Sequence, residues 1–169
     1  IKGLGEGPVE SILEARKAGP FKDLFDFCTR VDARKVNKRA LDALVRSGAL
    51  DNIGPKVDLD YDRAVMHAAL PEAVKAAEQS AANTNAGIAD LFGDVVPTCE
   101  NGENPYVEFH NTPRWSMKER LNGERDTLGL YLTGHPIDEY DEELKHLVPS
   151  RLSNLRADKA KQTVAGLVV

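Results

Sequence analysis

Few cysteines, few aromatic residues and no long apolar run characterise this 169-residue sequence. Cys28 and Cys99 stand apart, with no C-x-x-C pair and no histidine at ligand spacing, which argues against a disulfide framework and a structural zinc site. No eighteen-residue apolar stretch could span a bilayer, and the first twenty residues lack the basic and apolar regions of a signal peptide. We therefore expect a cytoplasmic protein without a membrane partner.

A catalytic constellation is also missing. The four histidines are scattered, and none lies beside a cysteine or serine in a nucleophile motif. The stretch GLGEGP matches neither the GxxxxGK[ST] loop nor the dinucleotide fingerprint. Asp58, Asp60 and Asp62 alternate as in a magnesium-binding carboxylate pair, but they lead into a predicted helix, where N-terminal capping explains them better. We expect no catalytic residue and no metal ligand in this chain.

Charge is divided unevenly along the chain. The formal net charge is −5, yet residues 1–56 carry eleven Lys or Arg against eight Asp or Glu, whereas residues 57–169 carry eleven against nineteen. The basic part contains a cluster of five cations, namely Arg30, Arg34, Lys35, Lys38 and Arg39. Such a cluster is typical of a solvated helix face and also of a surface that binds nucleic-acid phosphates, and charge alone leaves both interpretations open.

Apolar periodicity predicts a mainly α fold. In the first expected helix, which begins at Pro8, the apolar stripe is Val9, Ile12 and Leu13. Asn37 is the expected N-cap of the third helix, and Pro71 either kinks the fourth or starts a further one. The expected helices cover residues 8–18, 21–28, 37–47 and 60–82.

The stretch from residue 80 to 114 has no period and is longer than typical connections, so we expect it to be mobile or functional. It contains the apolar island IADLF, which either inserts into a partner's pocket or folds back onto its own domain. Further on, Ser116 and Glu119 have capping-box spacing, and the helix they open is expected to run through Leu132. Pro136 can open another helix, and only QTVAGLVV, at the end, has strand character.

The opening IKGLGEGP matches the hairpin of a helix-hairpin-helix DNA-binding motif. In such a hairpin the apolar residue between the glycines packs inward, and the glycine amides, aimed at a helix N-terminus, can hold a DNA phosphate. Here Gly3, Gly5 and Gly7 expose their amides, Leu4 anchors the turn and Lys2 adds charge. A plain turn between packed helices is the alternative.

Four segments of the chain carry a resemblance to a known family, and they occur in the order IKGLGEGPVESILEAR, LFDFCTRVDARKVNKRALDALVRSGALDNIG, IADLFG and GERDTLGLYLTGHPIDEY. On these segments the chain resembles the bacterial replicative DNA polymerase III alpha subunits. The resemblance covers essentially the whole chain. It implies a tandem helix-hairpin-helix domain for duplex DNA, an internal peptide that binds the sliding clamp, and the start of an OB domain. The helix that precedes the first hairpin in that family is missing, so the first motif is expected to be incomplete.

The resemblance implies four regions: a tandem helix-hairpin-helix domain over 1–82, a flexible linker over 83–114, a helical connector over 115–160, and the first strand of a truncated OB domain over 161–169. The implied DNA-binding residues are Lys2, Gly3, Leu4, Gly5, Gly7, Arg34, Lys35, Lys38, Arg39, Gly48, Gly54 and Lys56. The implied clamp-binding peptide is Ile88, Ala89, Asp90, Leu91 and Phe92. The family usually has glutamine where this chain has Ile88, which removes the hydrogen bonds of that amide.

By this resemblance the parent protein is a template-directed DNA polymerase, a nucleotidyltransferase whose catalytic aspartates lie upstream of residue 1. Magnesium is expected only at that catalytic part, and no cofactor is expected here. The implied partners are double-stranded DNA, the sliding clamp and other replicase subunits. The alternatives are a stand-alone helix-hairpin-helix adaptor of DNA repair or recombination, and a purely structural helical domain.

Overall fold

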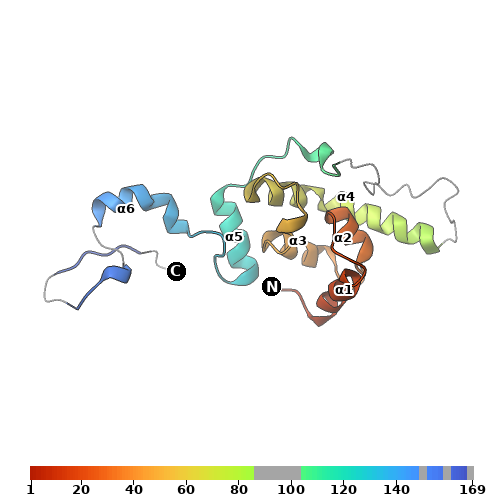
Figure 1. The fold of residues 1–169 in the computed structure, drawn as a ribbon, viewed down its shortest axis with the longest axis horizontal. Helices are drawn as coiled ribbons and strands as arrows, with labels where there is room; N and C mark the ends of the chain where they lie inside the picture. The colour runs from red at the N-terminus through yellow and green to blue at the C-terminus, as the bar shows by residue number, and fades with distance from the viewer. Residues whose placement is uncertain (86–103, 149–151, 158–160, 167–169) are drawn as a thin grey trace.

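The computed structural model describes residues 1–85, 104–148, 152–157 and 161–166, and the fold is mainly α, as predicted (Figure 1). The described residues contain no β-strand. The α-helices are α1 (Glu6–Arg16), α2 (Leu24–Arg30), α3 (Lys38–Arg46), α4 (Leu59–Asn85), α5 (Met117–Leu128) and α6 (Asp141–Leu147). Short 3-10 helices are η1 (Asp51–Ile53), η2 (Val107–Phe109), η3 (Pro136–Tyr140) and η4 (Leu152–Asn154).

The core lies between α2, α3 and the first half of α4. Its fully buried side chains include Leu24, Phe27, Val45, Val65 and Met66. Local sequence explains where these helices start. The side chain of Asp23 accepts a hydrogen bond from an amide of α2, and the side chain of Asn37, the predicted N-cap, accepts one from an amide of α3. Such caps satisfy amides that have no partner inside the helix. We refer to α1–α5 as the helical body.

The first helix departs from its predicted apolar face. It begins at Glu6 rather than Pro8, and two members of the predicted stripe, Val9 and Leu13, are 41% and 57% exposed. Only Ile12 of that stripe packs against the core. The inward face of α1 also contains the polar Ser11, which is buried and accepts a hydrogen bond from the amide of Asp32. A polar contact therefore replaces part of the apolar contact that periodicity predicted.

Pro71 neither ends nor restarts the fourth helix, since α4 runs unbroken from Leu59 to Asn85. Proline removes one intrahelical hydrogen bond. The ring is exposed, while Leu70 and Ala73 beside it are buried in the core. Burial of these neighbours holds the helix together across the proline.

Part of the predicted linker lies against the helical body. Tyr106 is 4% exposed, and its hydroxyl accepts a hydrogen bond from the amide of Leu24 (3.0 Å) and donates one to the carbonyl of Ile53 (2.8 Å). Burial raises the pKa of this phenol well above its usual range. Residues 104–115 are thereby attached to the core, whereas the preceding residues 86–103 lie outside the described ranges.

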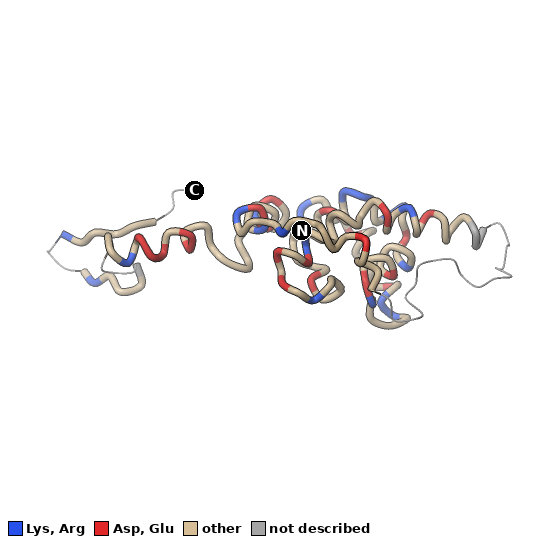
Figure 2. Tube along the Cα trace, turned by 90° about the horizontal axis from the view of Figure 1, so that it is seen from above, with Lys and Arg blue, Asp and Glu red and all other residues tan. Residues whose placement is uncertain are grey.

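The capping box of Ser116 and Glu119 opens α5 as predicted, but the predicted extension through Leu132 is wrong. The helix ends at Leu128 because Gly129 adopts a left-handed conformation (φ +81°), a common C-terminal stop. Leu132 is 64% exposed. We call η3 and α6 together the C-terminal arm, and Figures 1 and 2 show α6 extending away from the helical body.

The predicted strand at the end of the chain does not form where the structure describes it: residues 161–166 are irregular. A single strand has no partner for its backbone hydrogen bonds, so alternating apolar residues are not enough to make one. None of the helices in the described ranges combines the length and the apolar content needed to cross a membrane.

Candidate nucleic-acid interface

The first predicted hairpin is a turn that leads directly into α1. Gly3 has φ +84°, a conformation that residues with a side chain rarely adopt, and Gly5 is the extended N-cap of the helix. Leu4 between them packs against the core, which confirms the predicted anchor. The amide of Lys2 donates to the carbonyl of Thr127 (2.7 Å), so this turn is attached to the end of α5.

No packing contact requires glycine at two positions of this hairpin. A Cβ atom added at Gly5 or Gly7 would meet no atom within 4 Å, and neither residue has a positive φ. Gly7 lies inside the first turn of α1, and glycine within a helix is about 0.5–1 kcal/mol less favourable than alanine. Their missing side chains leave the backbone open to close approach by a ligand.

The amides at the start of α1 have no side-chain acceptor. Gly5 provides no cap, whereas Asp23, Asn37 and Ser116 cap α2, α3 and α5. The uncapped amides of a helix N-terminus, together with the helix dipole, favour an anion such as a phosphate. Pro8, in the same turn, contributes no amide. The first hairpin therefore presents amide donors without a side-chain cap, beside two positions that carry no side chain.

The glycines of the second predicted hairpin differ, because neighbouring atoms pack closely against both of them. Gly48 follows α3 with φ +79°, and a Cβ atom there would lie 2.2 Å from the guanidinium of Arg63. A Cβ atom at Gly54 would lie 3.1 Å from that of Asp62. These two glycines thus shape the turn between α3 and α4 and give no sign of a ligand. Lys56, in the same loop, is exposed.

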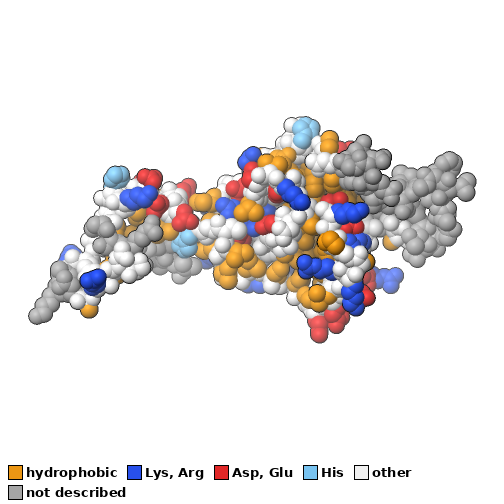
Figure 3. Space-filling view, in the orientation of Figure 1, with side chains coloured by type: hydrophobic (Ala, Val, Ile, Leu, Met, Phe, Trp, Pro, Cys, Tyr) orange, Lys and Arg blue, Asp and Glu red, His pale blue; other side chains and the backbone are white. Residues whose placement is uncertain are grey.

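Four members of the predicted cation cluster lie at and before the N-terminus of α3. Arg34, Lys35, Lys38 and Arg39 are exposed, and within the described ranges none of them forms an ion pair. Val36 between them is buried and fixes the turn on the core. Figure 3 shows acidic and basic side chains interspersed elsewhere on the helical body. The four cations are free to bind an anion.

The fifth cation, Arg30, has a structural role. Its guanidinium forms an ion pair with Asp26 (3.0 Å), donates to the carbonyl oxygens of Ala15 and Gly19, and lies 4.6 Å from the centroid of the Phe21 ring. These contacts attach the end of α1 to α2. Arg30 is therefore not part of the free cationic surface.

The three alternating aspartates stabilise the start of α4, as predicted. Asp58 accepts a hydrogen bond from the amide of Tyr61 (2.9 Å), and Asp62 accepts hydrogen bonds from the amides of Lys56 and Val57. Asp60 forms an ion pair with Arg120 of α5. Within the described part of the chain, no group of three or more His, Cys, Asp or Glu side chains could hold a metal ion.

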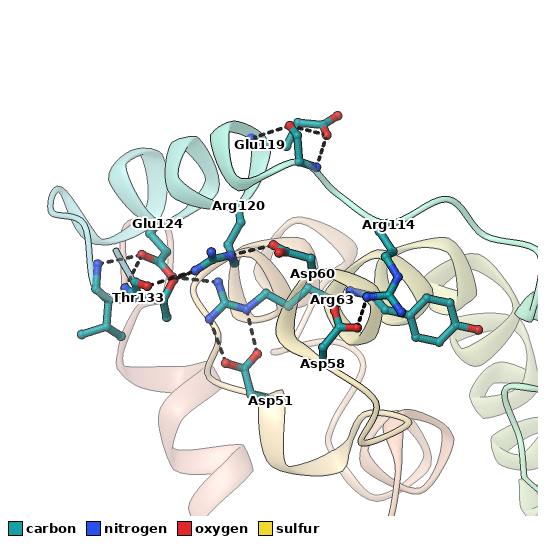
Figure 4. A network of polar contacts seen from close by, with 12 residues as sticks. Asp51, Asp58, Asp60, Arg63, Arg114, Glu119, Arg120, Glu124 and Thr133 are labelled. Carbon is teal, nitrogen blue, oxygen red and sulfur yellow. Dashed lines mark hydrogen bonds and ion pairs between the residues drawn. The ribbon is translucent and has the colours of Figure 1, made fainter. Parts of the chain in front are cut away.

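A buried ionic network joins the second hairpin to α5 (Figure 4). The side chain of Arg63, in α4, is 1% exposed and binds both carboxylate oxygens of Asp51 at 2.8 Å. Its third contact is the carboxylate of Glu124, fully buried in α5, at 2.9 Å. Glu124 also accepts hydrogen bonds from the amides of Leu132 and Thr133 and from the Thr133 hydroxyl. Each buried charge is thus compensated by several partners.

The contacts of this network keep both Arg63 and Glu124 ionised. Burial by itself raises the pKa of the Glu124 carboxyl, but the hydrogen bonds from Thr133, Arg63 and Leu132 outweigh burial and lower that pKa. Burial favours the neutral form of Arg63, but hydrogen bonds and attraction from Asp51 and Glu124 raise its pKa further. Both groups are therefore ionised at neutral pH.

Sequence reasoning missed this network. Arg63 and Glu124 are 61 residues apart, and no local pattern relates them. The one available signal was a charged residue directly before apolar residues of a predicted helix, as at Arg63 before Ala64 and Val65. The proposed clamp peptide, from Ile88 to Phe92, lies outside the described residues.

Comparison with known proteins places this chain in one family. Residues 1–58 match the family model of a helix-hairpin-helix motif. The whole chain aligns with proteins named DNA polymerase III subunit alpha, at 51% identity over 178 residues in Pseudomonas fluorescens, 50% over 172 in Vibrio cholerae and 44% over 173 in Escherichia coli K12. It spans 14–15% of the length of these curated relatives. Along its full length, the chain therefore belongs to the family of bacterial DNA polymerase III alpha subunits.

Proposed function

We propose that this chain is the duplex-DNA-binding and clamp-binding part of a replicative, template-directed DNA polymerase. The observation that carries the DNA-binding role is the first hairpin, where packing requires neither Gly5 nor Gly7 to be glycine and the amides of α1 have no side-chain cap. Close approach of a phosphate to the backbone accounts for both features. Contacts to phosphates carry no sequence information, which suits an enzyme that must copy any template.

The four exposed cations near α3 supply the charge for this role. Arg34, Lys35, Lys38 and Arg39 form no ion pair in the described structure, and Lys56 is exposed in the second hairpin. Cations that neutralise phosphates release counterions from DNA, and this release provides most of the affinity of non-specific binding. The net charge of −5 does not oppose this, since the acidic excess lies in residues 57–169. Figure 2 shows acidic residues of the C-terminal arm beyond the helical body.

We propose that in the whole protein these contacts support processive DNA synthesis. The protein would act in the cytoplasm, together with other replicase subunits. The nucleotidyl transfer and its magnesium ions belong, in this proposal, to parts of the subunit that this chain does not cover. The relatives' printed name favours this assignment over a repair or recombination adaptor, because the similarity extends beyond the helix-hairpin-helix motif to the whole chain. Residues 161–169 would then lead into an OB domain.

Alanine at Gly5 and Gly7 tests the first hairpin. The double variant Gly5→Ala/Gly7→Ala is expected to stay within about 1 kcal/mol of the unmodified chain in stability, because alanine is favoured over glycine inside the helix at position 7 and disfavoured at the N-cap position 5. Its affinity for duplex DNA is expected to fall about ten- to a hundredfold, since displaced phosphates lose charge-assisted hydrogen bonds of about 1.5–3 kcal/mol each. Urea denaturation and fluorescence anisotropy with a labelled duplex measure the two effects.

Gly166→Ala is the matched control, because a Cβ atom there also meets nothing within 4 Å but lies far along the chain from the hairpin. Its affinity for duplex DNA should equal that of the unmodified chain. Unchanged affinity in the Gly5/Gly7 variant would show that phosphates do not approach this backbone.

The clamp-binding role rests on the IADLF island, whose two large apolar side chains fit a short peptide that inserts into a partner's pocket. A single weak contact suffices here, because holding DNA and clamp together raises the effective concentration to about the millimolar range. The variant Leu91→Ala/Phe92→Ala should lose capture by immobilised sliding clamp and keep its affinity for duplex DNA. Ile88→Gln should strengthen capture by restoring the side-chain amide.

Val95→Ala/Val96→Ala, in the same stretch, is the control for apolar truncation and should leave capture by the clamp unchanged. Loss of both clamp capture and duplex binding in the Leu91/Phe92 variant would instead assign that pair to the fold of the DNA-binding body.

A further inference from the structure

One threonine attaches the C-terminal arm to the helical body. Thr133 donates its amide to one oxygen of the Glu124 carboxylate (3.0 Å) and its hydroxyl to the other (2.7 Å). The guanidinium of Arg120 donates to both the carbonyl and the hydroxyl oxygen of Thr133. Every polar group of this residue is therefore bonded to α5, immediately before the arm begins at Pro136.

The carboxylate that holds Thr133 also holds the second hairpin. Glu124 forms its ion pair with Arg63, and Arg63 binds Asp51 in the turn that follows α3 (Figure 4). Gly48, in the same turn, leaves the space that the Arg63 guanidinium occupies. The turn of the second hairpin and the start of the arm thus share one buried acid.

Other contacts of the arm with the body are few in the described residues. Gly134 lies against Leu121, with 3.7 Å from its Cβ position to the leucine Cδ2 atom. Next to the arm, His135 packs edge-on against Tyr131, with 5.4 Å between the ring centroids, and caps η3 reciprocally with Asp138. Tyr140 and Leu147 on the arm are 51% and 71% exposed, and both views show α6 away from the body (Figures 1 and 2). The direction of the arm therefore depends on the segment around Thr133.

We propose that Thr133, held by Glu124 and Arg120, is a positioning residue that sets the direction in which the C-terminal arm leaves the DNA-binding body. The inference rests on the proposed function in that this direction decides where the chain beyond the arm is held relative to bound duplex. The hydroxyl is the essential group, because it donates to Glu124 while accepting from Arg120. Valine has nearly the same shape and can do neither.

The distance between α4 and α6 tests the proposal. Spin labels are placed on the full 169-residue chain at Glu72→Cys and Glu143→Cys, both exposed positions, in a Cys99→Ser background. Cys28 can stay, because burial raises the pKa of its thiol to about 12 and leaves it unreactive. Pulsed electron paramagnetic resonance should give one narrow distance distribution. Thr133→Val should broaden it about twofold, since the arm has few other contacts, and Thr133→Ser should keep it narrow.

Arg46→Gln is the matched control. It removes an exposed ion pair between α3 and α5, Arg46 to Asp126 at 3.0 Å, without touching Thr133, and should leave the distribution narrow. Arg120→Gln is a second test variant. It removes the guanidinium that donates to Thr133 and also pairs with Asp60, while Glu124 keeps Arg63, and it should also broaden the distribution. Circular dichroism melting establishes that each variant is folded at the temperature of measurement.

An unchanged width in both Thr133→Val and Arg120→Gln overturns the proposal, as does a broad distribution in the reference chain. Equal broadening in Thr133→Ser or Arg46→Gln also overturns it, because loosening would then not depend on the hydroxyl. Duplex affinity, measured in parallel, separates the two hypotheses: a reference chain that fails to bind duplex DNA contradicts the proposed function and leaves the distance result unaffected.

Discussion

Replacing Arg63 by methionine is expected to lower the free energy of unfolding by about 3–5 kcal/mol, the usual cost of removing one partner of a buried ion pair. Methionine fills much of the same volume, so the loss comes from charge. Glu124 is fully buried and would keep only the hydrogen bonds from Leu132 and Thr133, while Asp51 would lose both of its contacts to the guanidinium. Urea denaturation followed by circular dichroism measures the change.

Arg46→Met provides the comparison for this prediction, since it removes an arginine whose pairs with Asp42 and Asp126 are exposed. Exposed pairs contribute about 0–1 kcal/mol, so this variant should remain close to the unmodified chain in stability. The double variant Arg63→Met/Glu124→Leu should recover part of the loss, because the buried carboxylate that Arg63 leaves unpaired is then removed as well. A loss below about 1 kcal/mol in Arg63→Met would show that water reaches the network.

Neutralising the four exposed cations is expected to weaken binding to duplex DNA about a hundredfold at low salt. The variant carries Arg34→Gln, Lys35→Gln, Lys38→Gln and Arg39→Gln. Each phosphate that is no longer neutralised makes the slope of log affinity against log salt shallower by about 0.9, which gives about 3.6 for four phosphates. Fluorescence anisotropy with a labelled duplex at several salt concentrations measures both quantities. Stability should change little, because these side chains are exposed and form no ion pair in the described structure.

A second variant with the same change in net charge separates local contacts from the overall field of the protein. It carries Lys75→Gln, Lys118→Gln, Arg125→Gln and Lys161→Gln, at exposed positions on other parts of the chain. Its affinity should fall far less, and its salt slope should stay near that of the unmodified chain. Equal losses in the two variants would contradict a phosphate-binding surface at α3.

The elements that the sequence predicted well are those built by neighbouring residues. Asn37 caps α3 and Ser116 with Glu119 opens α5, as their spacing indicates, because a cap needs only residues two or three positions apart. Leu4 anchors the first hairpin for a similarly local reason, since it is the one apolar residue between glycines. Asp58 caps α4, and Asp62 accepts hydrogen bonds from the loop before that helix.

The expectations that failed concern which side of a helix faces the core and where it ends. Periodicity placed Val9 and Leu13 inside, but both are exposed, because α1 contacts the core through Ile12, Ala15 and the buried Ser11. The apolar pattern extended α5 to Leu132, but the left-handed Gly129 ends it earlier. Apolar spacing shows that a helix has a buried side and cannot show what packs against that side.

By itself the sequence determined the helical class of this protein, the caps at Asn37 and Ser116 and the family to which it belongs, because these depend on local spacing and on order along the chain. The tertiary structure alone decided which charges are buried and which glycines are required by packing. Arg63 and Glu124 meet only when α5 folds onto α4, and Gly48 is explained only by the guanidinium beside it, whereas Gly5 and Gly7 face open space. Such roles depend on residues far apart in the chain, which no local pattern contains.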